Sequence, residues 1–130
     1  MSRATTRRNV LLGLGALSLA GCSHPAQRVL QGRWEGRRVE NFNESDMAAA
    51  TGWARGTTFE FQGARLSITL PAKSRRSGVY ELTEIEDRTV TLTVVDGNGE
   101  QSELRLTVDD ESSMRWMLDE GRAMVLERQP

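Results

Sequence analysis

Cysteine and histidine are nearly absent from this sequence, which contains one residue of each, Cys22 and His24. A single cysteine excludes an internal disulfide and a thiolate metal cluster. The shortage of histidine removes the usual general base and most zinc sites. We therefore expect a protein that is not an enzyme, that binds no cofactor or metal ion, and that is stabilised by side-chain packing.

Positive charge is also scarce once the first 21 residues are set aside. Those residues contain three of the 17 basic residues and none of the 18 acidic ones, which leaves 14 basic against 18 acidic groups, a net charge of −4. Proteins that bind nucleic acid concentrate positive charge on one face. We therefore expect no nucleic-acid partner.

The sequence lacks an apolar run long enough to cross a bilayer as a helix, which takes about 20 residues. The nearest candidate, Val10–Ala20, has 11 residues; it follows Arg3, Arg7 and Arg8 and is followed by Gly21. A positive segment, a short apolar stretch and small residues in this order indicate a secretory signal peptide.

The string Leu19-Ala20-Gly21-Cys22 resembles the bacterial lipobox. The resemblance implies that residues 1–21 are a lipoprotein signal peptide and that Cys22 carries diacylglycerol and a further acyl chain such as palmitate. It also implies a membrane partner through the lipid anchor, with residues 22–28 as a tether that Pro25 keeps extended. The alternatives are an unmodified cysteine or an ordinary cleavage site.

Two further features of the leader bear on location. Ser23 follows the lipidated cysteine where enteric bacteria commonly place Asp for inner-membrane retention, so the resemblance favours the outer membrane of the cell envelope, facing the periplasm. The segment Thr6–Leu11, which contains Arg7 and Arg8, resembles a twin-arginine export signal. General secretion and twin-arginine export both remain open.

Beyond the leader, apolar residues alternate with polar ones at a period of two, the pattern of strands with one buried face. A first strand carries Leu30 and Trp34, and segments rich in Gly, Asn and Asp separate the later runs and predict hairpin turns. Eight sequential strands predict an all-β, antiparallel up-and-down barrel, with a two-sheet sandwich as the alternative. The seven later runs are Phe59/Phe61, Leu66/Ile68/Leu70, Tyr80/Leu82, Val90/Leu92/Val94, Leu104/Leu106/Val108, Met114/Trp116/Leu118 and Met124/Leu126.

One stretch, residues 43–51, breaks this alternation. Asn43 or Ser45 suits a helix N-terminus, Met47 and Ala50 share a helical face, and Gly52 suits the end. We predict a short helix between the first and second strands.

The string Leu30-Gln31-Gly32-Arg33-Trp34 resembles the Gly-x-Trp start of lipocalin-like (calycin) barrels, and Met124–Arg128 resembles their last strand. The resemblance implies a lipocalin-like domain over residues 29–130. It also implies that Arg128 packs across Trp34 and closes one end of the barrel.

Two functions of different classes remain open from the sequence. One is a binding module for a small apolar or lipidic ligand, with the helix beside Trp53 and Met47 as a lid. The other is a structural lipoprotein whose filled barrel docks an envelope protein. The binding hypothesis predicts an open cavity, and the candidate ligand-facing residues are Trp53, Phe59, Tyr80, Leu92, Leu106 and Trp116.

Two polar segments are interpreted as ordinary loops. Pro71–Gly78 is the densest basic segment and a candidate for contact with phosphate or lipid headgroups, although such loops are usually only solvated. Asp96–Glu100 superficially resembles a calcium loop but lacks the twelve-residue ligand spacing, so we predict a turn.

Overall fold

The structure, a computed structural model, describes residues 25–71 and 75–130. The predictions for the signal peptide, the lipobox and Cys22 lie outside these residues. The chain divides after Leu30 into two units, which are described separately.

Helix α1 (Pro25–Leu30) is the described part of the first unit, and it corrects two expectations. Pro25 begins a helix instead of an extended tether, because the first position of a helix needs no N–H donor. Leu30 is the last helical residue, and the first strand starts only at Gly32.

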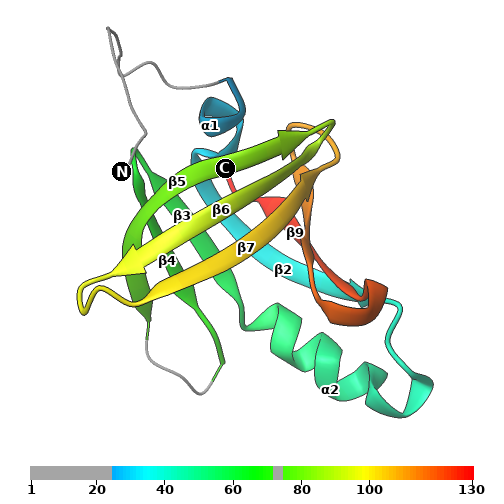
Figure 1. The fold of residues 1–130 in the computed structure, drawn as a ribbon. Helices are drawn as coiled ribbons and strands as arrows, with labels where there is room; N and C mark the ends of the chain where they lie inside the picture. The colour runs from blue at the N-terminus through cyan, green and yellow to red at the C-terminus, as the bar shows by residue number, and fades with distance from the viewer. Residues whose placement is uncertain (1–24, 72–74) are drawn as a thin grey trace, which may run out of the picture. The chain divides into compact units, whose positions relative to one another are not determined.

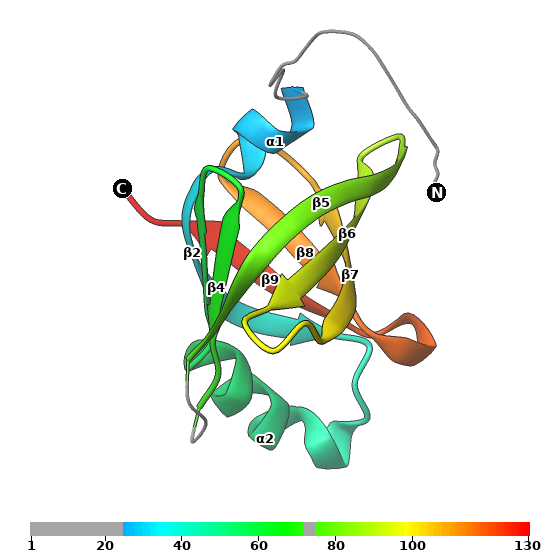
Figure 2. The same ribbon diagram turned by 60° about the vertical axis from the view of Figure 1, so that its left-hand side comes forward.

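The second unit is a closed barrel of antiparallel strands (Figures 1 and 2). Within the described residues eight strands pair in chain order, and β9 pairs with β2. The predicted up-and-down barrel is confirmed, whereas the sandwich is wrong because closure leaves no free sheet edge. The strands are β2 (Gly32–Glu40), β3 (Thr58–Gln62), β4 (Arg65–Thr69), β5 (Arg76–Glu86), β6 (Thr89–Asp96), β7 (Gln101–Val108), β8 (Ser113–Met117) and β9 (Ala123–Arg128).

A β-bulge in the first strand changes which side chains face the interior. The register between β2 and β9 shifts between Gly36 and Arg38. Arg37 and Arg38 are consequently both exposed, and Val39 is buried although it has the opposite parity to Trp34. Strict alternation from the sequence does not anticipate such an extra residue.

Helix α2 (Glu44–Arg55) follows the first strand, as predicted, and lies at one end of the barrel (Figures 1 and 2). Asn43 is the N-cap residue, but its backbone carbonyl, and not its side chain, accepts the bond from the Asp46 N–H at 2.9 Å. The helix is longer than expected, since Gly52 lies inside it and Gly56 follows its end.

The C-terminal end of α2 is fixed against β2 by the absence of a side chain at Gly36. A Cβ at this position would lie 2.1 Å from the carbonyl oxygen of Ala54. The Gly36 N–H donates to the Thr57 carbonyl at 3.0 Å, and the buried Thr57 hydroxyl donates to the Trp53 carbonyl at 2.8 Å. The close approach of strand and helix thus depends on a glycine.

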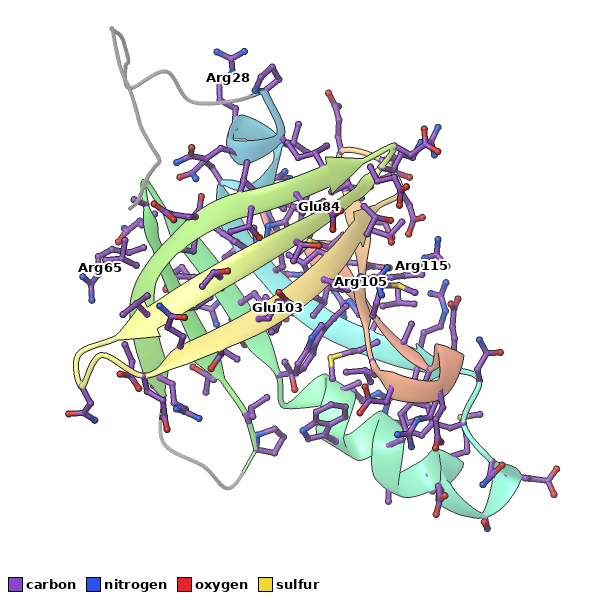
Figure 3. The ribbon with its side chains drawn as sticks, in the orientation of Figure 1. Arg28, Arg65, Glu84, Glu103, Arg105 and Arg115 are labelled. Atoms are coloured by element: carbon purple, nitrogen blue, oxygen red, sulfur yellow. The ribbon has the colours of Figure 1, made fainter. Side chains whose placement is uncertain are left out.

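The barrel interior is filled by large apolar side chains, while charged residues such as Arg65, Glu84 and Arg105 stand on its outer surface (Figure 3). We call the end beside α2 the mouth; it also includes the β6–β7 and β8–β9 connections. The opposite end, with Gln31, Gly63 and Glu111, is called the closed end. The largest fully buried side chains of the barrel are Trp34, Phe59, Phe61, Leu66, Leu92, Leu106, Met114, Met124 and Leu126.

Candidate binding site at the barrel mouth

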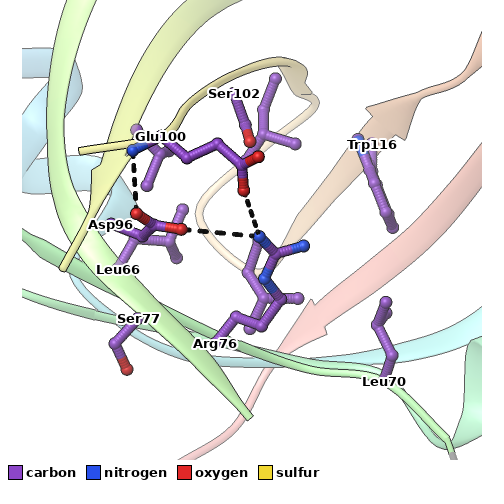
Figure 4. Close-up of a pocket in the computed structure, with 11 residues that line it drawn as sticks. Leu66, Leu70, Arg76, Ser77, Asp96, Glu100, Ser102 and Trp116 are labelled. Carbon is purple, nitrogen blue, oxygen red and sulfur yellow. Dashed lines mark hydrogen bonds and ion pairs between the residues drawn. The ribbon is translucent and has the colours of Figure 1, made fainter. Parts of the chain in front are cut away.

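A pocket of about 210 Å³, the mouth pocket, opens among strands β4 to β8 (Figure 4). Its walls are mainly apolar, and its polar groups are contributed by two short stretches, one at the start of β5 and one around the β6–β7 turn. The apolar lining residues are Leu66, Ile68, Leu70, Val94, Leu104 and Trp116, and the polar ones are Arg76, Ser77, Asp96, Glu100 and Ser102.

Arg76 lies between two carboxylates at the rim of this pocket (Figure 4). Its Nη2 atom is 3.4 Å from Glu100 Oε1 and 3.7 Å from Asp96 Oδ2. The side chains of Arg76 and Glu100 are 64% and 70% exposed, whereas that of Asp96 is only 21% exposed. Asp96 is therefore the sheltered carboxylate of the rim, whereas the side chains of Arg76 and Glu100 extend into solvent.

The Asp96 carboxylate is held in place by the turn that follows it. Its Oδ1 atom accepts the backbone N–H of Asn98 at 2.8 Å and of Glu100 at 3.0 Å. These two backbone hydrogen bonds, with a smaller contribution from Arg76, lower the pKa of Asp96 below its usual value. The carboxylate thus stays ionised at neutral pH. The predicted turn at Asp96–Glu100 is also confirmed.

Arg76 corrects the interpretation of residues 71–78 as one loop, because β5 already begins at Arg76. It shares the parity of Gly78 and Tyr80, both of which are buried. Gly78 has no side chain, so the alternation of inward and outward side chains cannot be followed through it in the sequence. A Cβ at Gly78 would lie 2.5 Å from the carbonyl oxygen of Val95. Because Tyr80 faces inward and side chains alternate along a strand, the residue four positions before it, Arg76, is expected to face the same side. This alternation is the signal in the sequence that could have identified Arg76.

A second, more open pocket of about 410 Å³, the side pocket, adjoins α2 and β8. It shares Leu104 and Trp116 with the mouth pocket. The ring centroids of Trp53 and Trp116 are 5.6 Å apart, so the helix contributes to this wall. The side pocket is lined by Phe42, Trp53, Glu103, Leu104, Trp116, Met117, Leu118, Asp119 and Arg122.

A chain of aromatic contacts runs from Trp116 at the mouth through the interior. The ring of Trp116 lies 5.3 Å from Phe59, Phe59 lies 6.4 Å from Phe61, and Phe61 lies 5.3 Å from Tyr80, all between centroids. The Tyr80 hydroxyl donates to the Gly63 carbonyl at 2.9 Å at the closed end. Packed rings therefore extend through the barrel interior from Trp116 to Tyr80.

The candidate ligand-facing residues separate into two groups. Phe59, Tyr80, Leu92 and Leu106 are at most 4% exposed and are not among the residues that line either pocket. These four side chains form packed core, so the open cavity that the binding hypothesis predicts along them is not present. The other two candidates lie at the mouth, since Trp116 lines both pockets and Trp53 lines the side pocket.

Trp34 and Arg128, the pair suggested by the sequence, are brought together at the closed end. The guanidinium carbon of Arg128 lies 4.3 Å from the centroid of the Trp34 ring. Arg128 Nε also donates to the Glu111 carbonyl at 2.7 Å, and its Nη1 donates to the Gln31 carbonyl. This contact covers the closed end of the barrel, opposite the end at which the two pockets lie.

Residues 25–71 and 75–130 contain no group of three or more His, Cys, Asp or Glu side chains placed to hold a metal ion. No helix in the same ranges is long and apolar enough to cross a membrane.

The strand pairing and the mouth pocket define a small, closed, antiparallel β-barrel with a pocket at one end. No protein-family model and no curated protein matches the chain. Similar solved structures include a lipocalin-like protein from Bacteroides uniformis, with 16% identity and a TM-score of 0.47, covering 78% of this chain and 99% of that one. An uncharacterized protein from Bacteroides eggerthii has 12% identity and a TM-score of 0.49, covering 76% and 98%.

Proposed function

We propose that this chain is an envelope lipoprotein whose barrel binds a small molecule with an apolar body and a polar end. The observation that carries the binding role is the mouth pocket, with apolar walls around Trp116 and polar groups gathered at its rim. Few polar groups on a mainly apolar pocket are typical of binding sites for small ligands. The role is binding and not catalysis.

The size of the pocket limits the ligand. Pockets for drug-sized molecules measure about 300–1,000 Å³, whereas the mouth pocket measures about 210 Å³. A short alkyl chain or a single ring fits such a volume, and any longer body extends along the side pocket or into solvent. The interior beyond Phe59 is closed by packing.

Titration with dodecanol, an uncharged ligand, tests apolar binding to residues 29–130 without the lipid anchor, which we call the soluble domain. Calorimetry should detect binding to the native domain and its loss in Ser102→Phe, which places a ring at the pocket lining. Ser45→Phe, at an exposed position on α2, is the matched control and should bind as the native domain does. Equal binding by both variants would place the ligand elsewhere.

The anchoring part of the proposal rests on the resemblance of residues 19–22 to a lipobox. Cells expressing the full chain should incorporate labelled palmitate into the protein, and the protein should sediment with the outer membrane. Cys22→Ala should lose both the label and the sedimentation. Label retained by the variant would remove Cys22 as the attachment site.

A filled barrel that docks an envelope protein is the second candidate, and the packed interior favours it. Val79 and Val95 are cross-strand partners on the outer surface and are 48% and 36% exposed. Native mass spectrometry of the protein, extracted from the envelope without delipidation, separates the candidates. A retained small molecule supports binding, whereas a stoichiometric protein partner supports docking.

A further inference from the structure

We infer that the mouth pocket selects amphipathic ligands with a cationic head, such as a long-chain amine, over fatty-acid anions. The inference rests on the proposed binding function and concerns the chemistry of the ligand's polar end. It comes from the balance of charged groups around the two pockets.

Carboxylates outnumber guanidinium groups at both pockets. The mouth pocket has Arg76 against Asp96 and Glu100. The side pocket, which adjoins it through Trp116, has Arg122 against Glu103 and Asp119. A ligand that extends from one pocket toward the other therefore meets an excess of negative charge at each rim.

Arg76 does not offer a ready site for an anion, because two carboxylates already neutralise it. A fatty-acid carboxylate would have to displace Glu100 and would still face Asp96. Asp96 cannot turn away easily, since the backbone N–H groups of Asn98 and Glu100 hold its Oδ1 atom. An anionic head would thus replace Glu100 as a partner of Arg76, with no gain in the number of ion pairs, and would be repelled by the Asp96 carboxylate.

A cationic head can instead take the place of the Arg76 guanidinium. The Arg76 side chain is 64% exposed, so it can move into solvent without uncovering a buried group. The ammonium group then pairs with Asp96 and Glu100, while the apolar chain contacts Leu66 and Trp116. The indole of Trp116 also presents an aromatic surface, which attracts cations.

Three probes of equal chain length separate the charge preference from apolar binding. Dodecylamine, dodecanol and dodecanoate are titrated into the soluble domain at pH 7, below their micelle concentrations, with calorimetric detection. Exposed charge pairs change affinity by about twofold to fivefold each. We expect the amine to bind about tenfold more tightly than dodecanoate, with the alcohol in between, and the gap to narrow in high salt.

Variants at the rim connect the preference to these residues. Glu100→Gln should lower the ratio of amine affinity to dodecanol affinity about threefold, and Arg76→Gln should raise that ratio. Glu84→Gln removes an exposed carboxylate on the outer surface (Figure 3) and is the matched control, expected to bind all three probes as the native domain does.

The outcomes distinguish this inference from the proposed function. Dodecanoate binding as tightly as the amine, or more tightly, overturns the charge preference while leaving the pocket as a binding site. Failure of all three probes to bind overturns both. An amine preference that is equal in Glu100→Gln and Glu84→Gln overturns the assignment to the rim.

Discussion

Trp34 and Arg128 are cross-strand partners in the pairing of β2 with β9, and the guanidinium carbon of Arg128 lies 4.3 Å from the Trp34 ring centroid. The first and last strands of the barrel are thus joined by backbone pairing and by a cation–π contact at one place. Because Arg128 also donates to the carbonyls of Gln31 and Glu111, it connects three segments of the closed end.

Arg128→Ala is expected to lower the free energy of unfolding by about 2 kcal/mol, the combined size of one cation–π contact and charged hydrogen bonds to carbonyls. Arg105→Ala, at an exposed position on β7, is the matched control and should change it by less than about 0.5 kcal/mol. Urea unfolding followed by circular dichroism measures both. Equal midpoints for the two variants would contradict a closing role for Arg128.

Gly36 and Gly52 should respond in opposite directions to the same substitution. A Cβ at Gly36 meets the Ala54 carbonyl oxygen at 2.1 Å, so Gly36→Ala must displace α2 or β2 and should cost about 2 kcal/mol or more. Gly52 lies inside α2 with open space around it, so Gly52→Ala should stabilise by about 0.5–1 kcal/mol. Thermal unfolding of both variants checks the prediction, and a stabilised Gly36→Ala would overturn the proposed contact.

The sequence predicted the strands well because one face of each is buried, and a buried face imposes alternation. The prediction from the sequence was wrong where a β-bulge or a glycine interrupts that alternation. The bulge near Arg37 moves Val39 to the interior, and Gly78 hides the inward parity of Arg76. The sequence does not predict helix α1, because proline breaks a helix in its interior, whereas Pro25 stands at the first helical position.

The site was less predictable than the fold. Inward parity correctly indicates that Phe59 and Leu106 face the interior, but it does not distinguish packed core from an accessible wall. That difference depends on whether neighbouring rings fill the axis, as Phe59 and Trp116 do. At the rim, Arg76 forms ion pairs with Asp96 and Glu100. The alternation of side chains along each strand does not show that these residues of two different segments lie close together.

Asp96 should make stability depend on pH in the acid range. Its pKa is lowered in the folded state, chiefly by the backbone N–H groups of Glu100 and Asn98. Its stabilising contribution is therefore complete above the ordinary Asp pKa of about 3.9 and is lost as pH falls through the lower folded value. The advantage of the native protein over Asp96→Asn should be constant from pH 7 to about 5 and shrink below about 4.

Urea unfolding at intervals between pH 7 and pH 2.5 provides the measurement. Asp110→Asn should behave in the same way, because the backbone N–H and the hydroxyl of Ser112 lower the pKa of Asp110. A native advantage that grows on acidification would contradict the assigned direction for either carboxylate.

Trp116 is shared by the linings of the two pockets, and its removal should join them. Its indole lines both the mouth pocket and the side pocket and contacts the rings of Trp53 and Phe59. Trp116→Ala should therefore admit a bulkier apolar probe, such as a fused-ring alcohol, that the native domain excludes. Trp53→Ala widens only the side pocket and is the control. Calorimetry should show new binding in Trp116→Ala alone; the same gain in Trp53→Ala would mean that the helix, and not Trp116, limits the volume of the site.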